Sequence, residues 1–236
     1  AAPKPTPVSH AAAALLAEKI YVAGGRGVDG QPCAALEVYD PRTGAWQPRA
    51  DLPVALEGHA LAAMDGRLYL FGGWDGSRAR AEVYAYAPDL DRWEARAAMP
   101  TPRAYAAAAA VEGKILIAGG VNAGAALDRV DFYFPNRDQT GGDPWESGAP
   151  LPQPRSHMAA AALADIVYFA GGDDPSNAGP LEYLLQSNTW ASFDLPPTPP
   201  VALPLLLPFH THLYLLDGAH YQAYQAIYNL SFPVIR

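Results

Sequence analysis

The sequence predicts an all-β fold, a five-bladed β-propeller of four-stranded antiparallel blades that occupies residues 1–236 as one domain. A repeat and the contents of each copy lead to this prediction. Glycines that end apolar runs recur at intervals of 48, 47, 52 and 46 residues, at Gly25, Gly73, Gly120, Gly172 and Gly218. Each interval holds four apolar runs of about 5–8 residues, which is the length of a strand rather than a helix.

The first repeat shows the order of elements within a blade. Its four strand-length runs, a to d, lie at 11–17, 20–24, 35–40 and 45–50. Pro41 follows strand c, where proline favours a tight turn. The later copies keep this order, so blades are expected at about 10–52, 53–100, 101–150, 151–197 and 198–236.

Runs of alanine, such as 106–110, begin the blades. Alanine is the best helix former, so a helix is the alternative interpretation. The run lies between Pro102 and the Glu112-Gly113 turn, which leaves too few residues for a stable helix. Small side chains suit strands crowded around the axis of a propeller, whereas Tyr and Trp fill the widening space between outer strands. Strands are therefore expected.

The stretch 25–30 also matches G-x-G-x-x-G, the spacing of dinucleotide-binding loops. A dinucleotide site needs a crossover helix after the glycines. The next segment is short, contains Val and Tyr, and ends at Asp40-Pro41, and the other copies do not keep the spacing. These glycines therefore belong to the repeat, and no cofactor is predicted.

Two aromatic landmarks keep the phase of the glycines in the first four copies. A tyrosine of strand c and a tryptophan that opens strand d are assigned to Tyr39, Tyr84, Tyr133 and Tyr183 and to Trp46, Trp93, Trp145 and Trp190. Together with the glycine pairs, these residues resemble the kelch-repeat family from residue 10 to residue 236. The resemblance implies a kelch-type β-propeller.

The two ends depart from that pattern. The fifth copy has Asp217-Gly218 in place of Gly-Gly and lacks the tryptophan, and its strands c and d are expected at 225–230 and 232–236. Kelch propellers more often have six or seven blades. The opening segment 3–10 resembles the exits of the later blades, so it is either the tail of a preceding blade or a strand that closes the ring. We expect a five-bladed ring, with a fragment of a larger propeller as the alternative.

Composition limits the partners. The formal net charge is -8 and the pI about 5.1, so no nucleic-acid partner is expected. Cys33 is the single cysteine, which rules out an intramolecular disulfide. The most apolar stretch, 201–216, is interrupted by prolines and histidines and does not qualify as a membrane span. The chain opens without Met, as a processed secreted protein or a fragment does. An extracellular or periplasmic location is expected, with the cytoplasm as the alternative.

Alternating strand directions place the b–c loops and the d–a connections on one face, and these loops are the longer and more polar ones. This face is the expected ligand site. Its candidate ligand-binding residues are Arg26, Trp74, Asp75, Arg103, Tyr105, Asn122, Arg155, His157, Asp173 and Asp174. Trp74 beside Asp75 suits stacking on a sugar ring or anchoring a protein partner. Salt bridges between blades are the alternative role of Arg103 and Arg155.

No metal site is predicted. His10, His59 and His157 are assigned to one repeat position, which suggests a metal, but a repeated residue usually makes the same local hydrogen bond in each copy. Asp173, Asp174 and Asn177 offer too few ligands for calcium. No catalytic residues are assigned.

These features predict a non-enzymatic recognition module that binds a protein or carbohydrate, on its own or as a subunit or domain of a larger assembly. The alternative is a sugar-active enzyme that resembles sialic acid mutarotases, with Arg155, His157 and Asp173 as candidates for the acid/base pair. Galactose oxidase is a more distant resemblance, because its copper site needs a cysteine cross-linked to a tyrosine and Cys33 has no aromatic neighbour in the sequence.

Overall fold

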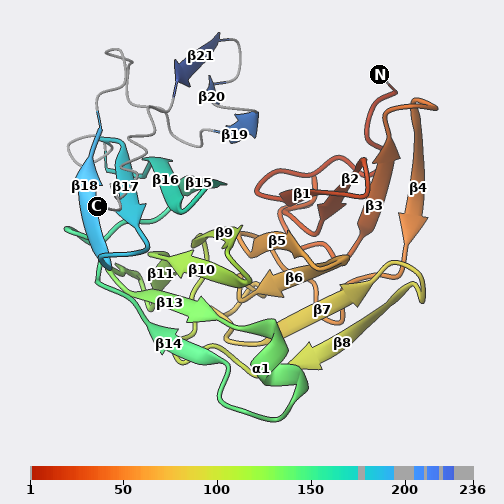
Figure 1. Cartoon of the computed structure of the whole chain (residues 1–236). Helices are drawn as coiled ribbons and strands as arrows, with labels where there is room; N and C mark the ends of the chain where they lie inside the picture. Colours follow the sequence, from red (N-terminus) through yellow and green to blue (C-terminus); the bar gives the residue numbers. More distant parts are fainter. Residues whose placement is uncertain (1, 175–178, 194–204, 210–211, 218–219, 226–236) are drawn as a thin grey trace, which may run out of the picture.

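The computed structural model describes residues 2–174, 179–193, 205–209, 212–217 and 220–225. It contains four antiparallel sheets of four strands, which follow one another along the chain around a common centre (Figure 1). This confirms an all-β propeller with four-stranded blades. No helix in the described part of the chain is long and apolar enough to cross a membrane.

Each blade runs outward from an inner strand in the order a, b, c, d. The strands are β1 (Ala12–Leu16), β2 (Lys19–Ala23), β3 (Leu36–Asp40) and β4 (Ala45–Arg49) in blade one; β5 (Ala60–Met64), β6 (Arg67–Phe71), β7 (Val83–Ala87) and β8 (Arg92–Arg96) in blade two; β9 (Ala107–Val111), β10 (Lys114–Ala118), β13 (Val130–Tyr133) and β14 (Trp145–Ser147) in blade three; and β15 (Met158–Leu163), β16 (Ile166–Gly171), β17 (Leu181–Leu184) and β18 (Thr189–Ser192) in blade four.

The fifth repeat differs from the prediction. The described residues hold four complete blades, and the fifth repeat contributes a three-stranded sheet of β19 (Leu205–Phe209), β20 (His212–Asp217) and β21 (His220–Gln225). The expected position of its strand c, 225–230, is wrong. Asp217 pairs directly with His220, so the long b–c loop of the other repeats is missing and the third strand comes earlier. The strand d expected at 232–236 lies outside the described residues.

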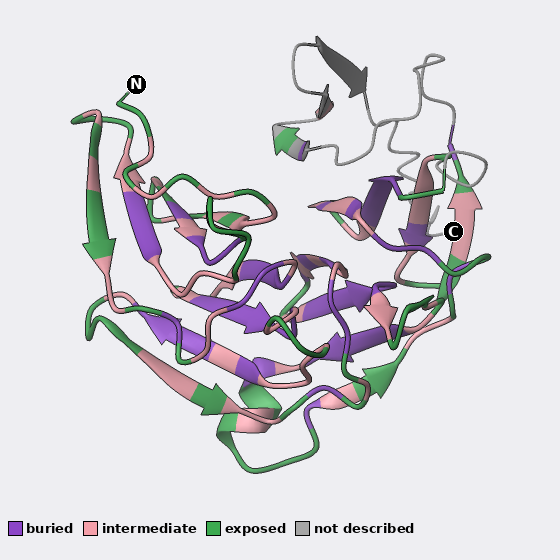
Figure 2. Ribbon diagram, turned by 180° about the vertical axis from the view of Figure 1, so that it is seen from behind, coloured by how far each residue is buried: buried purple, intermediate pink, exposed green. Residues whose placement is uncertain are grey.

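The alanine runs are inner strands, as predicted. Strands β1, β5, β9, β15 and β19 contact one another in succession. The alanines of β1, β5, β9 and β15 line a central cavity of about 330 Å³, together with Leu15, Leu61, Leu206 and Pro208. Figure 2 shows the buried residues concentrated on the inner and middle strands, with exposed residues at the outer edge. Small side chains near the axis therefore let the inner strands approach one another, as the taper of a propeller requires.

Aromatic side chains pack between the outer strands, with one correction to the assigned positions. Tyr86, not Tyr84, is the repeat tyrosine of blade two, because Tyr86 pairs with Trp93 as Tyr39 pairs with Trp46. Strand c of this blade holds two tyrosines two residues apart, so both fit the pattern of the sequence. Tyr86 is fully buried, and its ring lies 5.1 Å from that of Trp93.

The same hydrogen bonds join consecutive blades. Asp91, at the c–d turn of blade two, accepts the Tyr86 hydroxyl at 2.6 Å and the backbone N–H of Ala50 at 2.9 Å. Ala50 directly follows strand d of blade one, and its carbonyl accepts the Trp93 indole N–H at 3.0 Å. Asp138 in blade three and Asn188 in blade four likewise each accept the hydroxyl of the repeat tyrosine and a backbone N–H that follows strand d of the preceding blade. The ends of strand d in blades one, two and three are thus held by the next blade.

The c–d turn of blade three is elaborated and contains the helix α1 (Pro135–Gln139). The guanidinium of Arg137 lies 3.9 Å from the centre of the Phe134 ring. A short hairpin of β11 (Val121–Asn122) and β12 (Ala125–Ala126) forms the b–c loop of the same blade. These two elaborations lie at opposite ends of the blade, since the c–d turns and the b–c loops emerge from opposite ends of antiparallel strands.

Candidate functional site

The b–c loops and the d–a connections share one face of the propeller. Short antiparallel bridges join the two sets of loops, between Ser9 and Arg26, between Glu57 and Trp74 and between Ala104 and Val121. In blade four the N–H of Asp173 donates to the carbonyl of Ser156 at 3.3 Å. Arg26, Trp74, Val121 and Asp173 therefore occupy one repeat position, directly after the glycine pair.

In each d–a connection, one residue follows the position that bonds the b–c loop. These four residues form a ring at the entrance to the inner strands. Its members are His10, Gly58, Tyr105 and His157, and all have positive φ angles between 53° and 58°. The N–H of each of the last three residues donates to the carbonyl of the preceding member: Gly58 to His10 at 3.0 Å, Tyr105 to Gly58 at 2.5 Å and His157 to Tyr105 at 3.0 Å. We call this set the mouth ring. It holds the four connections in register around the axis.

This geometry corrects the assignment of the histidines. His59 does not share the repeat position of His10 and His157, because Gly58 occupies that position in blade two. Glycine at a position of positive φ displaces the histidine by one residue. His59 instead points between blades one and two, where a side chain on Gly24 would contact its ring. A metal bound by the three histidines of one ring is therefore not possible.

Beside the mouth ring, an ion pair forms around Glu57, whose side chain is 1% exposed. The guanidinium of Arg26 donates through Nε to Glu57 Oε2 at 2.5 Å and through Nη2 to Oε1. The Tyr105 hydroxyl also donates to Oε1, at 2.9 Å. The hydrogen bond from Arg26 lowers the pKa of Glu57 despite its burial, and Tyr105 adds to this effect. The carboxylate therefore stays ionised, which fixes Arg26 and Tyr105 in place.

Three rings of the mouth ring pack together. Tyr105 stacks on His157 with the ring centres 4.2 Å apart and 20° between their planes, and His10 meets Tyr105 edge to face at 6.0 Å. Burial lowers the pKa of His157, although Asp173 opposes this effect. The His157 Nδ1 lies 2.9 Å from the Ser156 hydroxyl and 3.9 Å from Asp173. A largely neutral imidazole therefore lies between an aromatic ring and a carboxylate.

Gly58 makes room for the Tyr105 ring, since a Cβ on Gly58 would lie 2.5 Å from it. We expect Gly58→Ala to lower the free energy of unfolding by about 2–3 kcal/mol, because the clash adds to the cost of positive φ. Gly66→Ala is the matched control: Gly66 also has positive φ, but its new Cβ would meet nothing within 4 Å. Its cost should be about 1 kcal/mol. Urea unfolding measures both, and equal losses would contradict the steric role of Gly58.

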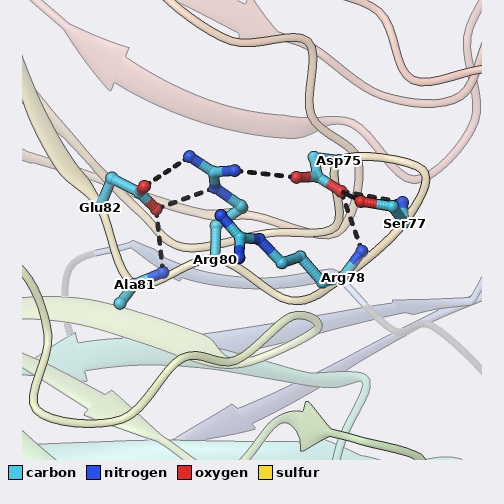
Figure 3. Close-up of polar contacts among 6 residues, drawn as sticks. All are labelled: Asp75, Ser77, Arg78, Arg80, Ala81 and Glu82. Carbon is cyan, nitrogen blue, oxygen red and sulfur yellow. Dashed lines mark hydrogen bonds and ion pairs between the residues drawn. The ribbon is translucent and has the colours of Figure 1, made fainter.

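Asp75 is engaged within its own loop (Figure 3). Its Oδ1 accepts the N–H and the hydroxyl of Ser77, at 2.8 and 2.7 Å, and the N–H of Arg78 at 2.9 Å. Its Oδ2 pairs with Arg80 at 3.0 Å, and Arg80 also binds Glu82. The Ser77 hydroxyl contributes most to lowering the pKa of Asp75. These contacts shape the b–c loop of blade two and leave Asp75 few lone pairs for a ligand.

The other sequence-predicted residues fall into two groups. Trp74 is partly exposed beside Glu57, Asn122 lies on the hairpin of blade three, and Asp173 and Asp174 are exposed. Asn177 lies outside the described residues. Arg103 and Arg155 are buried instead. Arg103 pairs with Asp131 of its own blade, and Arg155 donates to the carbonyl of Gly179 at 2.7 Å. Neither arginine faces a ligand at the mouth ring, since their side chains fill the blades.

Sequence reasoning missed Glu57, the residue that holds the site together. Its equivalents are Ser9, Ala104 and Ser156, so no repeated residue type marks the position. The signal available was its place directly before the Gly58-His59 pair. Among the described residues, no three or more His, Cys, Asp and Glu side chains are grouped as metal ligands. The Cys33 thiol accepts the N–H of Ala35 at 3.4 Å.

Comparisons with known proteins find kelch-repeat proteins and a solved structure with a similar fold. A family model described as the KLHDC2/KLHL20/DRC7 Kelch-repeats domain matches residues 1–172. Alpha-scruin of Limulus polyphemus is 35% identical over 65 residues, which are 28% of this chain and 7% of that protein. Kelch-like protein 15 of Danio rerio is 38% identical over 61 residues, which are 23% of this chain and 10% of that protein. The matches therefore span a small part of these relatives' length. The solved structure titled "Structure of YjhT" has a TM-score of 0.77 at 17% identity, covering 94% of this chain and 82% of that one.

Proposed function

The chain belongs to the kelch-repeat family of β-propellers, and from this premise we propose that it is a recognition module whose ligand binds over the mouth ring. The observation that supports the proposal is the cluster of Arg26, Glu57, Tyr105 and His157. It combines a fixed guanidinium, an ionised carboxylate and stacked rings at one point of the loop face. Side chains held by their neighbours bind at a lower entropic cost than mobile ones do.

The ligand in this proposal is a protein segment or a carbohydrate. Arg26 is 44% exposed, so its remaining N–H groups are available to an acceptor of the ligand. Trp74 and the Tyr105–His157 stack offer flat apolar surface beside it, which suits a sugar ring or the side chain of a partner. Asp173 adds a hydrogen-bond acceptor. A location outside the cytoplasm and a role as a domain or subunit of a larger assembly belong to the same proposal, as does a fifth blade built from residues 198–236.

The proposal is tested with two probe libraries, a glycan array and displayed random peptides, screened against the full chain. We expect Trp74→Ala and His157→Ala each to weaken binding of the selected probe about tenfold or more, because they remove contact area at the centre of the site. Arg137→Ala is the matched control, since Arg137 is 46% exposed on the opposite face. Calorimetry measures the affinities, and thermal melts verify that the variants fold. Probe binding that survives both mouth variants and fails with Arg137→Ala would reject this face.

The sugar-active enzyme remains the alternative function. It needs an acid and a base that face one substrate, and Arg155 is 5% exposed and donates to the carbonyl of Gly179. The His157–Asp173 pair, 3.9 Å apart, is the arrangement that favours it. NMR of sugar anomerisation in the presence of the protein separates the two functions. Acceleration that is lost in His157→Ala would support the enzyme and contradict a purely binding role.

A further inference from the structure

Three arginines of blade two surround one carboxylate. Arg92, Glu94 and Arg96 alternate along β8, so their side chains lie on one face of the sheet. Arg92 donates to Glu94 Oε1 through Nη2 at 2.6 Å and through Nε at 3.2 Å. Arg96 donates to Oε2 at 2.7 Å, and Arg67 of β6 donates to the same oxygen at 3.5 Å. We call Arg67, Arg92, Glu94 and Arg96 the arginine cluster.

The arginine cluster holds more positive charge than its own carboxylate balances. The hydrogen bond from Arg92 lowers the pKa of Glu94, so Glu94 is ionised. Three positive charges and one negative charge leave the cluster with a net charge of +2. Two more carboxylates lie nearby, Asp65 in the turn between β5 and β6 and Asp138 in α1. Neither forms an ion pair with the three arginines in the described residues, and Asp138 instead accepts the Tyr133 hydroxyl and a backbone N–H.

Two buried donors beside the carboxylate lack an acceptor. Among the described residues, neither Nε of Arg96 nor the hydroxyl of Tyr69 has a hydrogen-bond partner, and Tyr69 is 0% exposed. Burial raises the pKa of Tyr69 and the charges of Arg67 and Arg96 oppose this effect, so both guanidinium groups lie near the hydroxyl. Gln139 of α1 also lies near it, without a hydrogen bond of normal geometry. A buried donor without an acceptor costs free energy, which an acceptor from a ligand would recover.

The arginine cluster is specific to blade two. The residues that match Arg92 by strand register are Ala45 in blade one and Thr189 in blade four. The residue that matches Arg67 in blade four is Ile166. Features that the propeller itself needs recur, as the paired tyrosine and tryptophan do in all four complete blades of the described chain. The three arginines are therefore not needed to build a blade, which favours a role in binding.

We propose that the arginine cluster is a second binding site, which takes a phosphoryl group. A phosphate monoester at neutral pH carries a charge of about −1.5 to −2 and three acceptor oxygens, which match the charge of the cluster and its donors without acceptors. Arginine suits this group because its N–H donors bind two phosphate oxygens in parallel. Arg92 is 62% exposed and Arg67 is 31% exposed, so the group can approach from solvent. This inference is independent of the ligand that binds at the mouth ring.

Calorimetric titration of the full-length chain with inorganic phosphate tests the proposal, at constant ionic strength and with chloride as the reference anion. We expect a dissociation constant of about 1 mM or lower and a weakening of about tenfold or more in Arg92→Met, which removes one of the guanidinium groups. Arg137→Met is the matched control and should bind phosphate as the wild type does, because Arg137 is 46% exposed and pairs with a single carboxylate, that of Glu146. Thermal melts without phosphate verify that the variants fold.

Glu94→Gln distinguishes a binding role from a purely structural one. It removes the charge that competes with phosphate for the arginines, so phosphate should bind about fivefold or more tightly. Unchanged or weaker binding in Glu94→Gln would contradict direct contact between phosphate and the cluster.

The source of the phosphoryl group is identified with a library of phosphoserine peptides and its unphosphorylated counterpart. Peptides that bind about tenfold or more tightly than phosphate, and only when phosphorylated, would assign the site to a modified protein partner. Phosphate binding without such a gain would assign it to a small phosphorylated molecule.

Three further results would overturn the proposal. Phosphate that binds no better than chloride would mean that water alone satisfies the two buried donors. Phosphate binding that survives both Arg92→Met and Arg67→Met would place the anion elsewhere on the protein. Equal weakening in Arg92→Met and Arg137→Met would show a general effect of charge rather than a site.

Discussion

Replacing Arg103 with methionine should lower the free energy of unfolding by about 3–5 kcal/mol, because it removes the fully buried partner of the Asp131 carboxylate and leaves only the partly exposed Arg129 beside it. The Arg103 side chain is 0% exposed, and its guanidinium pairs with Asp131, which is 1% exposed. Arg103 Nη1 also donates to the carbonyls of Arg129 and Gly119, at 3.2 and 3.4 Å. Burial, and after it the charge of Arg129, lowers the pKa of Arg103 to about 10, so it remains charged at neutral pH.

Arg129→Met is the matched comparison. Arg129 binds the same carboxylate, at 2.7 Å, but its side chain is 36% exposed. Its loss should cost about 1 kcal/mol or less, because Arg103 still neutralises Asp131. Adding Asp131→Asn to Arg103→Met should restore part of the loss, since it removes the buried charge that has lost its buried partner. Urea unfolding measures each value. A loss for Arg103→Met no larger than that for Arg129→Met would contradict the role of the buried ion pair.

The fold was predictable because its signal is repeated. The glycine pairs, the opening tryptophans and the alanine runs each occur in four copies, so an error in one copy does not change the period. Prediction of individual residues failed where a copy departs from the repeat pattern by one or two positions. Gly58 displaced His59 from the mouth ring, and two tyrosines in strand c of blade two allowed Tyr84 to be taken for Tyr86. Sequence spacing cannot decide between such registers, which are fixed by backbone pairing.

The candidate site was predictable only in part, for a different reason. Arg26, Tyr105, His157 and Asp173 were singled out because they lie on the loop face, and the structure brings them together. Arg103 occupies an equally polar stretch of the chain and is buried. Whether an arginine that follows proline points outward or into a blade depends on a partner distant in the chain, here Asp131, 28 residues away. Glu57 was missed because its equivalents in the other copies, Ser9, Ala104 and Ser156, are not acidic, so no repeated residue type marks the position.

Acidification should destabilise the protein through His59, which is 5% exposed between blades one and two. In the described structure neither ring nitrogen has a hydrogen-bond partner. Burial lowers the pKa of His59 from its ordinary 6.5 to about 4. The unfolded chain therefore binds more protons than the folded chain between these two values, so stability falls as the pH drops from 6.5 to 4. A shift of this size corresponds to a loss of about 3 kcal/mol at the acid end.

His59→Met isolates this contribution. Met158 occupies the matching position of blade four, so the propeller accepts methionine there. The stability of the wild type relative to His59→Met should be constant above pH 7, where His59 is neutral in both states. It should then fall steadily between pH 6.5 and 4, because only the wild type must keep an imidazole uncharged inside the blade interface. Urea unfolding at a series of pH values gives the difference curve, and carboxylates that titrate in the same range cancel in it. A flat curve down to pH 4 would mean that His59 gains a water or a protein partner when it takes up a proton.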